Sequence, residues 1–189
     1  MAEGETETDY FAHWRRDRGS RLLEIILEPS AGVPRTVVER AIAMRDEAAS
    51  AARRQRDATL RFDDVWCLFD RDEHPHLSDA IIQARDNGIN VALSSPSFEL
   101  WLLLHFQQQN AHIERDALRH QCTTYLAGYS KRITEKLFTL LAPRYSEALR
   151  RARELDAWHD TRGTAGANPS TAVYKLAQRL DVLVSPTYR

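Results

Sequence analysis

The sequence predicts an α/β protein with a mostly parallel sheet flanked by helices, followed by a helical C-terminal extension. Two observations predict this class. In the first half of the chain, short apolar runs alternate with longer segments of helical periodicity, which is typical of βαβ units and a parallel sheet. From residue 98 onward, the apolar patterns all have helical spacing. We therefore expect an α/β domain over residues 1–108 and a helical extension packed on it over residues 109–189.

Three apolar runs are predicted as strands, over residues 21–28, 65–69 and 89–93. Continuous apolar runs of this length suit parallel strands that helices cover on both faces. Pro34 suits the first position of a helix, and Gly88 suits the residue that follows one. The predicted helices span residues 8–17, 34–56, 78–87, 98–108, 114–126, 132–141, 144–159 and 170–180.

Length, composition and charge exclude several classes of protein. The 189 residues suffice for one domain of ordinary size, and 43% hydrophobic with 28% charged residues are typical of a globular chain. No apolar run approaches the roughly 20 residues of a membrane span. The N-terminus is acidic where a targeting signal would be basic, so we expect a cytoplasmic protein. The formal net charge of −1 gives no overall attraction for a nucleic acid, so such a contact requires a local patch or a bound metal.

The two cysteines, Cys67 and Cys122, are isolated from each other in the sequence. They cannot form a disulfide framework or a four-cysteine zinc site. We expect both to be buried thiols.

The strongest chemical feature is the acidic segment FDRDEH (residues 69–74), which follows a predicted strand. Ligands of open α/β folds bind at the carboxyl ends of the strands. Because side chains alternate along an extended chain, Asp70 and Asp72 point the same way. Neighbouring carboxylates repel each other unless a cation lies between them, and their oxygens suit Mg²⁺ or Mn²⁺. The segment therefore indicates a metal site, with a solvated turn or a helix cap as the alternative.

Two further acidic elements lie where helices are predicted to begin. Residues 3–7 (EGETE) precede the first helix, and the alternative to a functional role is a frayed acidic tail with a capping threonine. Residues 94–101 (SSPSFELW) follow the third predicted strand. Ser97 suits a helix cap there, and Glu99 suits the first turn of the helix, which favours negative charge. Capping alone would account for both residues.

Together these blocks resemble the RloB-like proteins, prokaryotic TOPRIM-fold proteins often encoded beside an AAA-type ATPase in phage-defence loci. The resemblance covers nearly the whole chain. It is carried by EGETETDYF (residues 3–11), DRDEH (residues 70–74), SSPSFELWLLLHF (residues 94–106) and NPST (residues 168–171).

The resemblance implies a TOPRIM site, with a glutamate after the first strand and an Asp-x-Asp after the third. On this sequence Glu3, Asp70 and Asp72 would hold Mg²⁺ or Mn²⁺ and act as the catalytic residues. In such a site the metal neutralises phosphate charge, and the glutamate acts in general acid/base catalysis. Glu99 is the next candidate for a role beside the metal or the substrate, and His74 is a candidate for substrate binding.

The sequence departs from the family pattern at its start. Only Met1 and Ala2 precede Glu3, where the family has an apolar strand, so the first strand is truncated and we expect it to lie upstream of Met1. A milder departure is that Ser95 stands where asparagine is expected and Ser97 where cysteine is common.

Other chemical features have plain alternatives. The HPH segment at residues 74–76 imitates a zinc site, but the proline between the histidines constrains the loop. Lys131 lies in a predicted loop, where it contacts a phosphate or belongs to an exposed turn. The arginine clusters at residues 53–56 and 150–153 are phosphate contacts or solvated helix faces. The apolar stretch at residues 101–106 predicts buried core and not a platform for stacked bases.

These observations lead to one functional hypothesis and one rival. The first is a Mg²⁺-dependent nuclease effector of antiphage defence that acts with an AAA-type ATPase on DNA or RNA. The rival is a non-catalytic TOPRIM scaffold that binds and regulates the ATPase. Metal binding through Asp70 and Asp72 would distinguish them, because a scaffold has no need of it.

Overall fold

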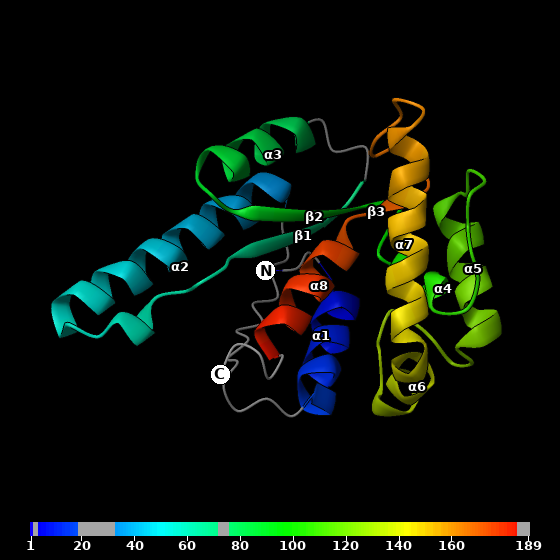
Figure 1. Cartoon of the computed structure of the whole chain (residues 1–189), viewed down its shortest axis with the longest axis horizontal. Coiled ribbons are helices and arrows are strands. Elements are labelled where there is room, and N and C mark those ends of the chain that lie inside the picture. Colours follow the sequence, from blue (N-terminus) through cyan, green and yellow to red (C-terminus); the bar gives the residue numbers. More distant parts are fainter. Residues whose placement is uncertain (2–3, 19–32, 72–75, 185–189) are drawn as a thin grey trace.

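The computed structural model describes residues 1, 4–18, 33–71 and 76–184. Figure 1 shows a small open sheet with helices packed around it. The predicted strand at residues 21–28 lies outside the described residues, as do three predicted site residues, Glu3, Asp72 and His74. In chain order the elements are α1 (Glu5–Arg18), α2 (Pro34–Gln55), η1 (Ala58–Leu60), β1 (Trp66–Asp70), α3 (Leu77–Asp86), β2 (Asn90–Ser95), α4 (Glu99–Leu104), α5 (Arg115–Tyr125), α6 (Glu135–Leu141), η2 (Ala142–Arg144), α7 (Tyr145–Asp160), β3 (Ser170–Thr171) and α8 (Val173–Val184).

The described sheet has the strand order β1-β2-β3. β1 and β2 are parallel, with Cys67 opposite Val91 and Asp70 opposite Ser94, so two of the predicted strands and their direction are confirmed. β3 is antiparallel to β2. The backbone of Met1 also bonds to β1, since its amino group donates to the carbonyl of Trp66 and its carbonyl accepts from the N–H of Leu68.

The prediction of a helix from residue 170 is wrong at its first residues. Ser170 and Thr171 form β3, and α8 begins only at Val173. The Oγ atoms of Ser94 and Thr171 lie 2.8 Å apart in a buried hydrogen bond, and the N–H of Ala172 donates to the carbonyl of Leu93. The edge of β2 thus provides hydrogen-bond partners for residues 171–172. If a helix began at residue 170, the polar groups on that edge of β2 would be left unpaired.

Helices cover both faces of the sheet, as the continuous apolar strands predict. Cys67 and Phe69 face one side and pack with buried residues of α2 and α3, such as Val38 and Ala80. Leu68 faces the other side and belongs to a larger core that contains residues of α1, α4, α5, α6, α7 and α8. Successive strand residues point to opposite faces, so a single short strand contributes to both cores. This arrangement holds the carboxyl end of β1 between helices from distant parts of the chain.

The centre of the larger core is α4, in which residues 100–104 are completely buried. The prediction of buried core is confirmed for residues 101–104, although the helix ends at Leu104 and so is shorter than predicted. Both cysteines are buried, as predicted. Among the described residues, no helix has the length and apolar character that crossing a membrane requires. The larger core includes residues on both sides of position 108, and the division of the chain there stays a prediction.

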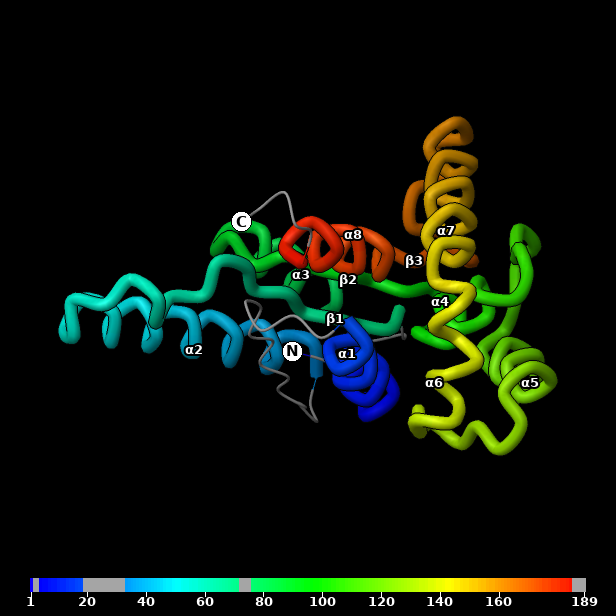
Figure 2. Tube along the Cα trace, turned by 60° about the horizontal axis from the view of Figure 1, so that its bottom comes forward, coloured from blue at the N-terminus to red at the C-terminus, as the bar shows by residue number. Residues whose placement is uncertain are grey.

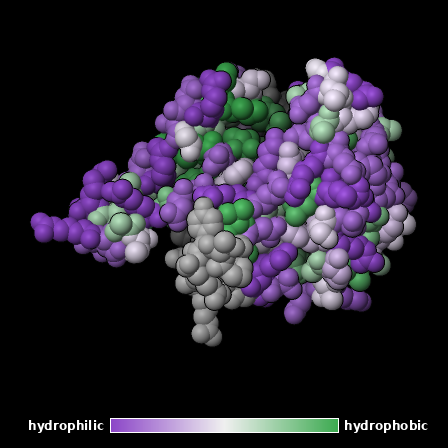
Figure 3. All heavy atoms as spheres, in the orientation of Figure 1, coloured by the Kyte–Doolittle hydropathy of each residue, from purple (hydrophilic) through white to green (hydrophobic). Residues whose placement is uncertain are grey.

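α2 extends well beyond the sheet. Its first half is buried against the sheet through residues such as Val37 and Ala41. Its outer half, the short helix η1 and the chain that returns to β1 form a projecting arm, which Figures 1 and 2 show at the end of the molecule opposite α4, α5 and α7. In Figure 3 the surface of this arm is mostly hydrophilic on the face shown.

Candidate functional site

The candidate site is built around Asp70, the last residue of β1. Its Oδ1 accepts a 2.8 Å hydrogen bond from the backbone N–H of Phe98, which directly precedes α4. Its Oδ2 lies 3.4 Å from Nη2 of Arg115 on α5. Nη2 of Arg115 also donates to the carbonyl of Pro96 at 3.0 Å. The strand end, the loop before α4 and the start of α5 therefore hold this carboxylate in one orientation.

Glu99 supplies a second carboxylate to the same region, from the first turn of α4. It is 7% exposed, and both of its oxygens have partners. Oε2 accepts a 2.6 Å hydrogen bond from Oγ of Ser97, and Oε1 accepts one of 3.0 Å from the hydroxyl of Tyr129. Nε of Arg119 lies 3.9 Å from Oε1. Burial thus restricts Glu99 to one position in which hydroxyl groups replace water.

The structure corrects two local expectations around this carboxylate. Ser97 does not cap α4 with its side chain, because its hydroxyl donates to Glu99 instead. Tyr129, in the predicted exposed turn at residues 129–131, is 5% exposed and reaches Glu99. Lys131 in that loop is exposed and has a positive φ of 64°. Its carbonyl accepts a 2.7 Å hydrogen bond from Thr6, so the loop is bound to α1 by its backbone.

Glu7 brings a third carboxylate, to which sequence reasoning assigned no role. α1 begins at Glu5, so Thr6 and Glu7 lie in its first turn and are 7% and 5% exposed. A frayed acidic tail is therefore the wrong interpretation for these two residues. The carboxylate of Glu7 turns back over Gly4, where a Cβ would lie 2.6 Å from Oε2.

Glu7 and Glu99 change the protonation chemistry of Asp70. Burial raises the pKa of Asp70 from its ordinary value of 3.8 to about 8. The charges of Glu7 and Glu99 contribute to this shift in the same direction as burial, whereas Arg115 and the N–H of Phe98 oppose it. The net effect is that the ionised form of Asp70 has too little positive charge near it to balance its own negative charge. A cation bound at Asp70 would relieve that deficit.

Burial and the neighbouring Glu99 also keep two other groups protonated. Burial, and secondarily the charge of Glu99, raises the pKa of Cys122 to about 12. Its thiol donates to the carbonyl of Glu99 at 3.3 Å and is no nucleophile in this state. The same two causes raise the pKa of Tyr129, so its hydroxyl remains a hydrogen-bond donor.

Replacing Tyr129 by phenylalanine is expected to lower the free energy of unfolding by about 1–2 kcal/mol. The change leaves Oε1 of the buried Glu99 without its hydroxyl donor, which costs more than a lost exposed hydrogen bond. Urea denaturation measures the loss. Tyr125→Phe is the matched control, because its exposed hydroxyl donates to Gln107, and we expect it to change stability by less than about 0.5 kcal/mol. Equal effects of the two changes would contradict the structural role of Tyr129.

The structure brings together only part of the predicted residue set. Asp70 and Glu99 belong to one site, and Lys131 borders it through its backbone. Within the described ranges, no group of three or more histidine, cysteine, aspartate or glutamate side chains is arranged to hold a metal ion. His76 of the alternative zinc motif lies 3.5 Å from Asp79, and both side chains are largely exposed.

The fold and the site define a class of protein: a mixed α/β protein with a buried acidic site at the carboxyl end of a parallel strand pair. The chain belongs to the RloB-like protein family, whose family model matches residues 1–180. Searches of curated proteins and of solved structures found no significant match to the chain. The family resemblance expected from the sequence is therefore confirmed over almost the entire length.

Proposed function

We propose that this protein is a TOPRIM-type, Mg²⁺-dependent nuclease that cleaves phosphodiester bonds of a nucleic acid in antiphage defence, together with an AAA-type ATPase. The observation that carries the proposal is the state of Asp70. It ends a parallel strand, is fixed by the N–H of Phe98, and has its pKa raised to about 8 by burial and by neighbouring carboxylates. Arg115 acts to lower this pKa, but burial together with Glu7 and Glu99 outweighs it, so a further cation at Asp70 would find little competing positive charge.

The donor set is compatible with magnesium. Mg²⁺ prefers hard oxygen ligands and is commonly held by one or two carboxylates together with substrate phosphates. Asp70 would provide a ligand, with Glu3 and Asp72 as its proposed partners. We add Glu7 to this proposed group because its carboxylate lies close enough to raise the pKa of Asp70.

Each residue of the site would have a separate task in cleavage. The bound metal would neutralise phosphate charge and stabilise the attacking or leaving oxygen. The N–H of Phe98 holds Asp70, while Ser97 and Tyr129 hold Glu99 beside it. Arg115 places a fixed positive charge next to Asp70, where a phosphate would approach. Glu99 is thus a positioning residue, since its oxygens are already bonded within the protein.

A cleavage assay on a panel of DNA and RNA substrates tests the proposal, with Mg²⁺ or Mn²⁺ and with or without the neighbouring ATPase. We expect cleavage of one substrate class by the wild type and its loss in Asp72→Asn. Cleavage that persists in this variant would refute the assigned metal ligands. If the folded protein cleaves no substrate while the ATPase is bound, the result would favour the rival, a non-catalytic scaffold that regulates the ATPase.

A further inference from the structure

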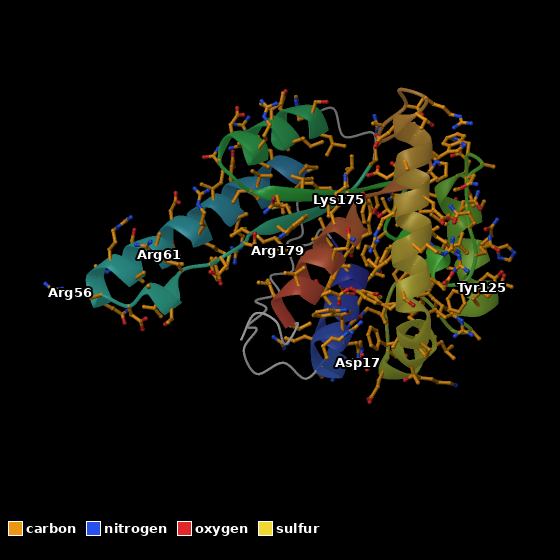
Figure 4. The ribbon with its side chains drawn as sticks, viewed as in Figure 1. Asp17, Arg56, Arg61, Tyr125, Lys175 and Arg179 are labelled. Carbon is orange, nitrogen blue, oxygen red and sulfur yellow. The ribbon has the colours of Figure 1, made fainter. Side chains whose placement is uncertain are left out.

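The end of the projecting arm carries four exposed arginines, Arg53, Arg54, Arg56 and Arg61, which we call the arm arginines. They come from three parts of the chain: the last turn of α2, the residue that ends it, and the residue after η1. Figure 4 labels Arg56 at the outer end of the arm and Arg61 farther back along it.

The arm arginines lack the internal partners that other arginines have. Among the described residues, none of the four forms an ion pair with a carboxylate, and Arg53 only donates to Oγ of Ser50. Asp57, the one acidic residue among them, is bonded to the N–H and hydroxyl of Thr59. Earlier on the same helix, Arg35 and Arg45 each bond to a carboxylate, of Glu39 and Asp46.

The second arginine cluster of the sequence provides a contrast. Arg150 bonds to Glu147 and Glu154, and Arg151 donates to the carbonyl of Leu104 and lies 3.6 Å from Glu147. These side chains contribute to the packing of α7. The two clusters look alike in the sequence, but of the two the arm cluster alone forms no ion pair with a carboxylate in the described part of the chain.

Arg56 occupies a position that glycine would fill with less strain. Its φ of 54° and ψ of 35° place it in the left-handed region at the end of α2. Glycine is the usual residue there because it has no Cβ. Arginine at this position therefore does not stabilise the end of α2 better than glycine would. What it adds there is its charged side chain.

We propose that the arm arginines bind the phosphate backbone of the nucleic acid, at a site separate from the candidate cleavage site. The arm projects from the rest of the molecule and carries four arginines that form no ion pair with a carboxylate of the described residues, which suits an extended polyanion. Guanidinium groups form paired hydrogen bonds with phosphate oxygens. The chain returns from the arm into β1, which ends at Asp70, so the two sites lie toward opposite ends of one strand. The inference rests on the proposed function only in taking a nucleic acid as the substrate.

Binding measured without cleavage tests this inference. The full chain with Asp70→Asn is titrated against labelled DNA and RNA duplexes by fluorescence anisotropy, between about 50 and about 200 mM salt. In this background, Arg56→Gly with Arg61→Gln removes two charges. The matched control, Arg85→Gln with Arg150→Gln, also removes two, from exposed arginines that pair with carboxylates. Thermal denaturation accompanies each variant, and we expect the glycine at residue 56 to leave the melting temperature unchanged or raise it.

We expect the arm variant to bind about 10-fold more weakly and to lose about two from the slope of log K against log salt concentration. The control is expected to keep both values. An arm variant that binds like the control would overturn the inference and leave the proposed nuclease untouched. A parent protein that binds neither duplex even at low salt would overturn the inference and remove nucleic acid from the proposed function as well. Arm-dependent binding, together with no cleavage of any substrate by the wild-type protein, would support the inference while counting against the nuclease.

Discussion

Asp70→Asn is expected to reduce metal-dependent cleavage at least about 100-fold while the protein remains folded. Asparagine has almost the same shape as aspartate and keeps an oxygen that accepts from the N–H of Phe98. It lacks the negative charge that would bind Mg²⁺ and the second oxygen that faces Arg115. The loss would therefore be one of metal binding and not of local structure. Initial rates over a range of Mg²⁺ concentrations measure it.

The matched control for this prediction is Asp79→Asn. Asp79 lies on α3 with a side chain that is 73% exposed, and it contacts only His76 among the ion pairs described. The same chemical change there should alter neither the cleavage rate nor its Mg²⁺ dependence. Full activity in Asp70→Asn would refute the central role of Asp70, whatever the substrate. An equal loss in both variants would show that the effect is not specific to the site.

The second large effect concerns the stability of the metal-free protein as a function of pH. Burial raises the pKa of Asp70 in the folded chain to about 8, against 3.8 when the group is free in solution. Between these values the folded protein holds a proton that the unfolded chain has released. Asp70 therefore makes its full contribution to the free energy of unfolding below about pH 4, and this contribution is lost as the pH rises to about 8. The slope is at most about 1.4 kcal/mol per pH unit, and we expect a total loss of the order of 3–5 kcal/mol.

Asp70→Asn should remove this dependence because the amide does not titrate. The variant is thus expected to equal the wild type in stability near pH 4 and to exceed it at pH 8, as measured by urea denaturation without divalent metal. His105 also titrates, since burial lowers its pKa from 6.5 to about 4, so its contribution rises between those values. Because His105 is present in both proteins, its contribution cancels in the difference in stability between Asp70→Asn and the wild type. A variant that is less stable than the wild type at pH 8 would contradict the raised pKa of Asp70.

Magnesium should oppose the same loss of stability. A cation that binds the ionised carboxyl group stabilises the folded state through mass action, so Mg²⁺ should stabilise the wild type at pH 8 more than Asp70→Asn. A regulatory scaffold without a metal site would show no such difference. Stability and cleavage therefore test the site independently, because one needs no substrate.

Local sequence patterns determined much of the secondary structure. The apolar runs at residues 65–69 and 89–93 correspond to β1 and β2 within two residues at each end, and the long helices α2, α5 and α7 lie where their periodicity places them. The acidic residue Asp70 at a strand end and the buried stretch at residues 100–104 were also predictable. These features depend on neighbours in the chain, which the sequence displays directly.

Tertiary structure decided which charges meet. Glu7, Asp70 and Glu99 are far apart in the sequence and come together only because α1, β1 and α4 pack at one end of the sheet. The hydroxyl of Tyr129 reaches Glu99 for the same reason. The arginine clusters at residues 53–56 and 150–153 have similar sequences, yet only the second is paired with carboxylates. Periodicity reports the side of a helix or strand that is buried, whereas an ion pair or a pKa depends on which elements that burial brings into contact.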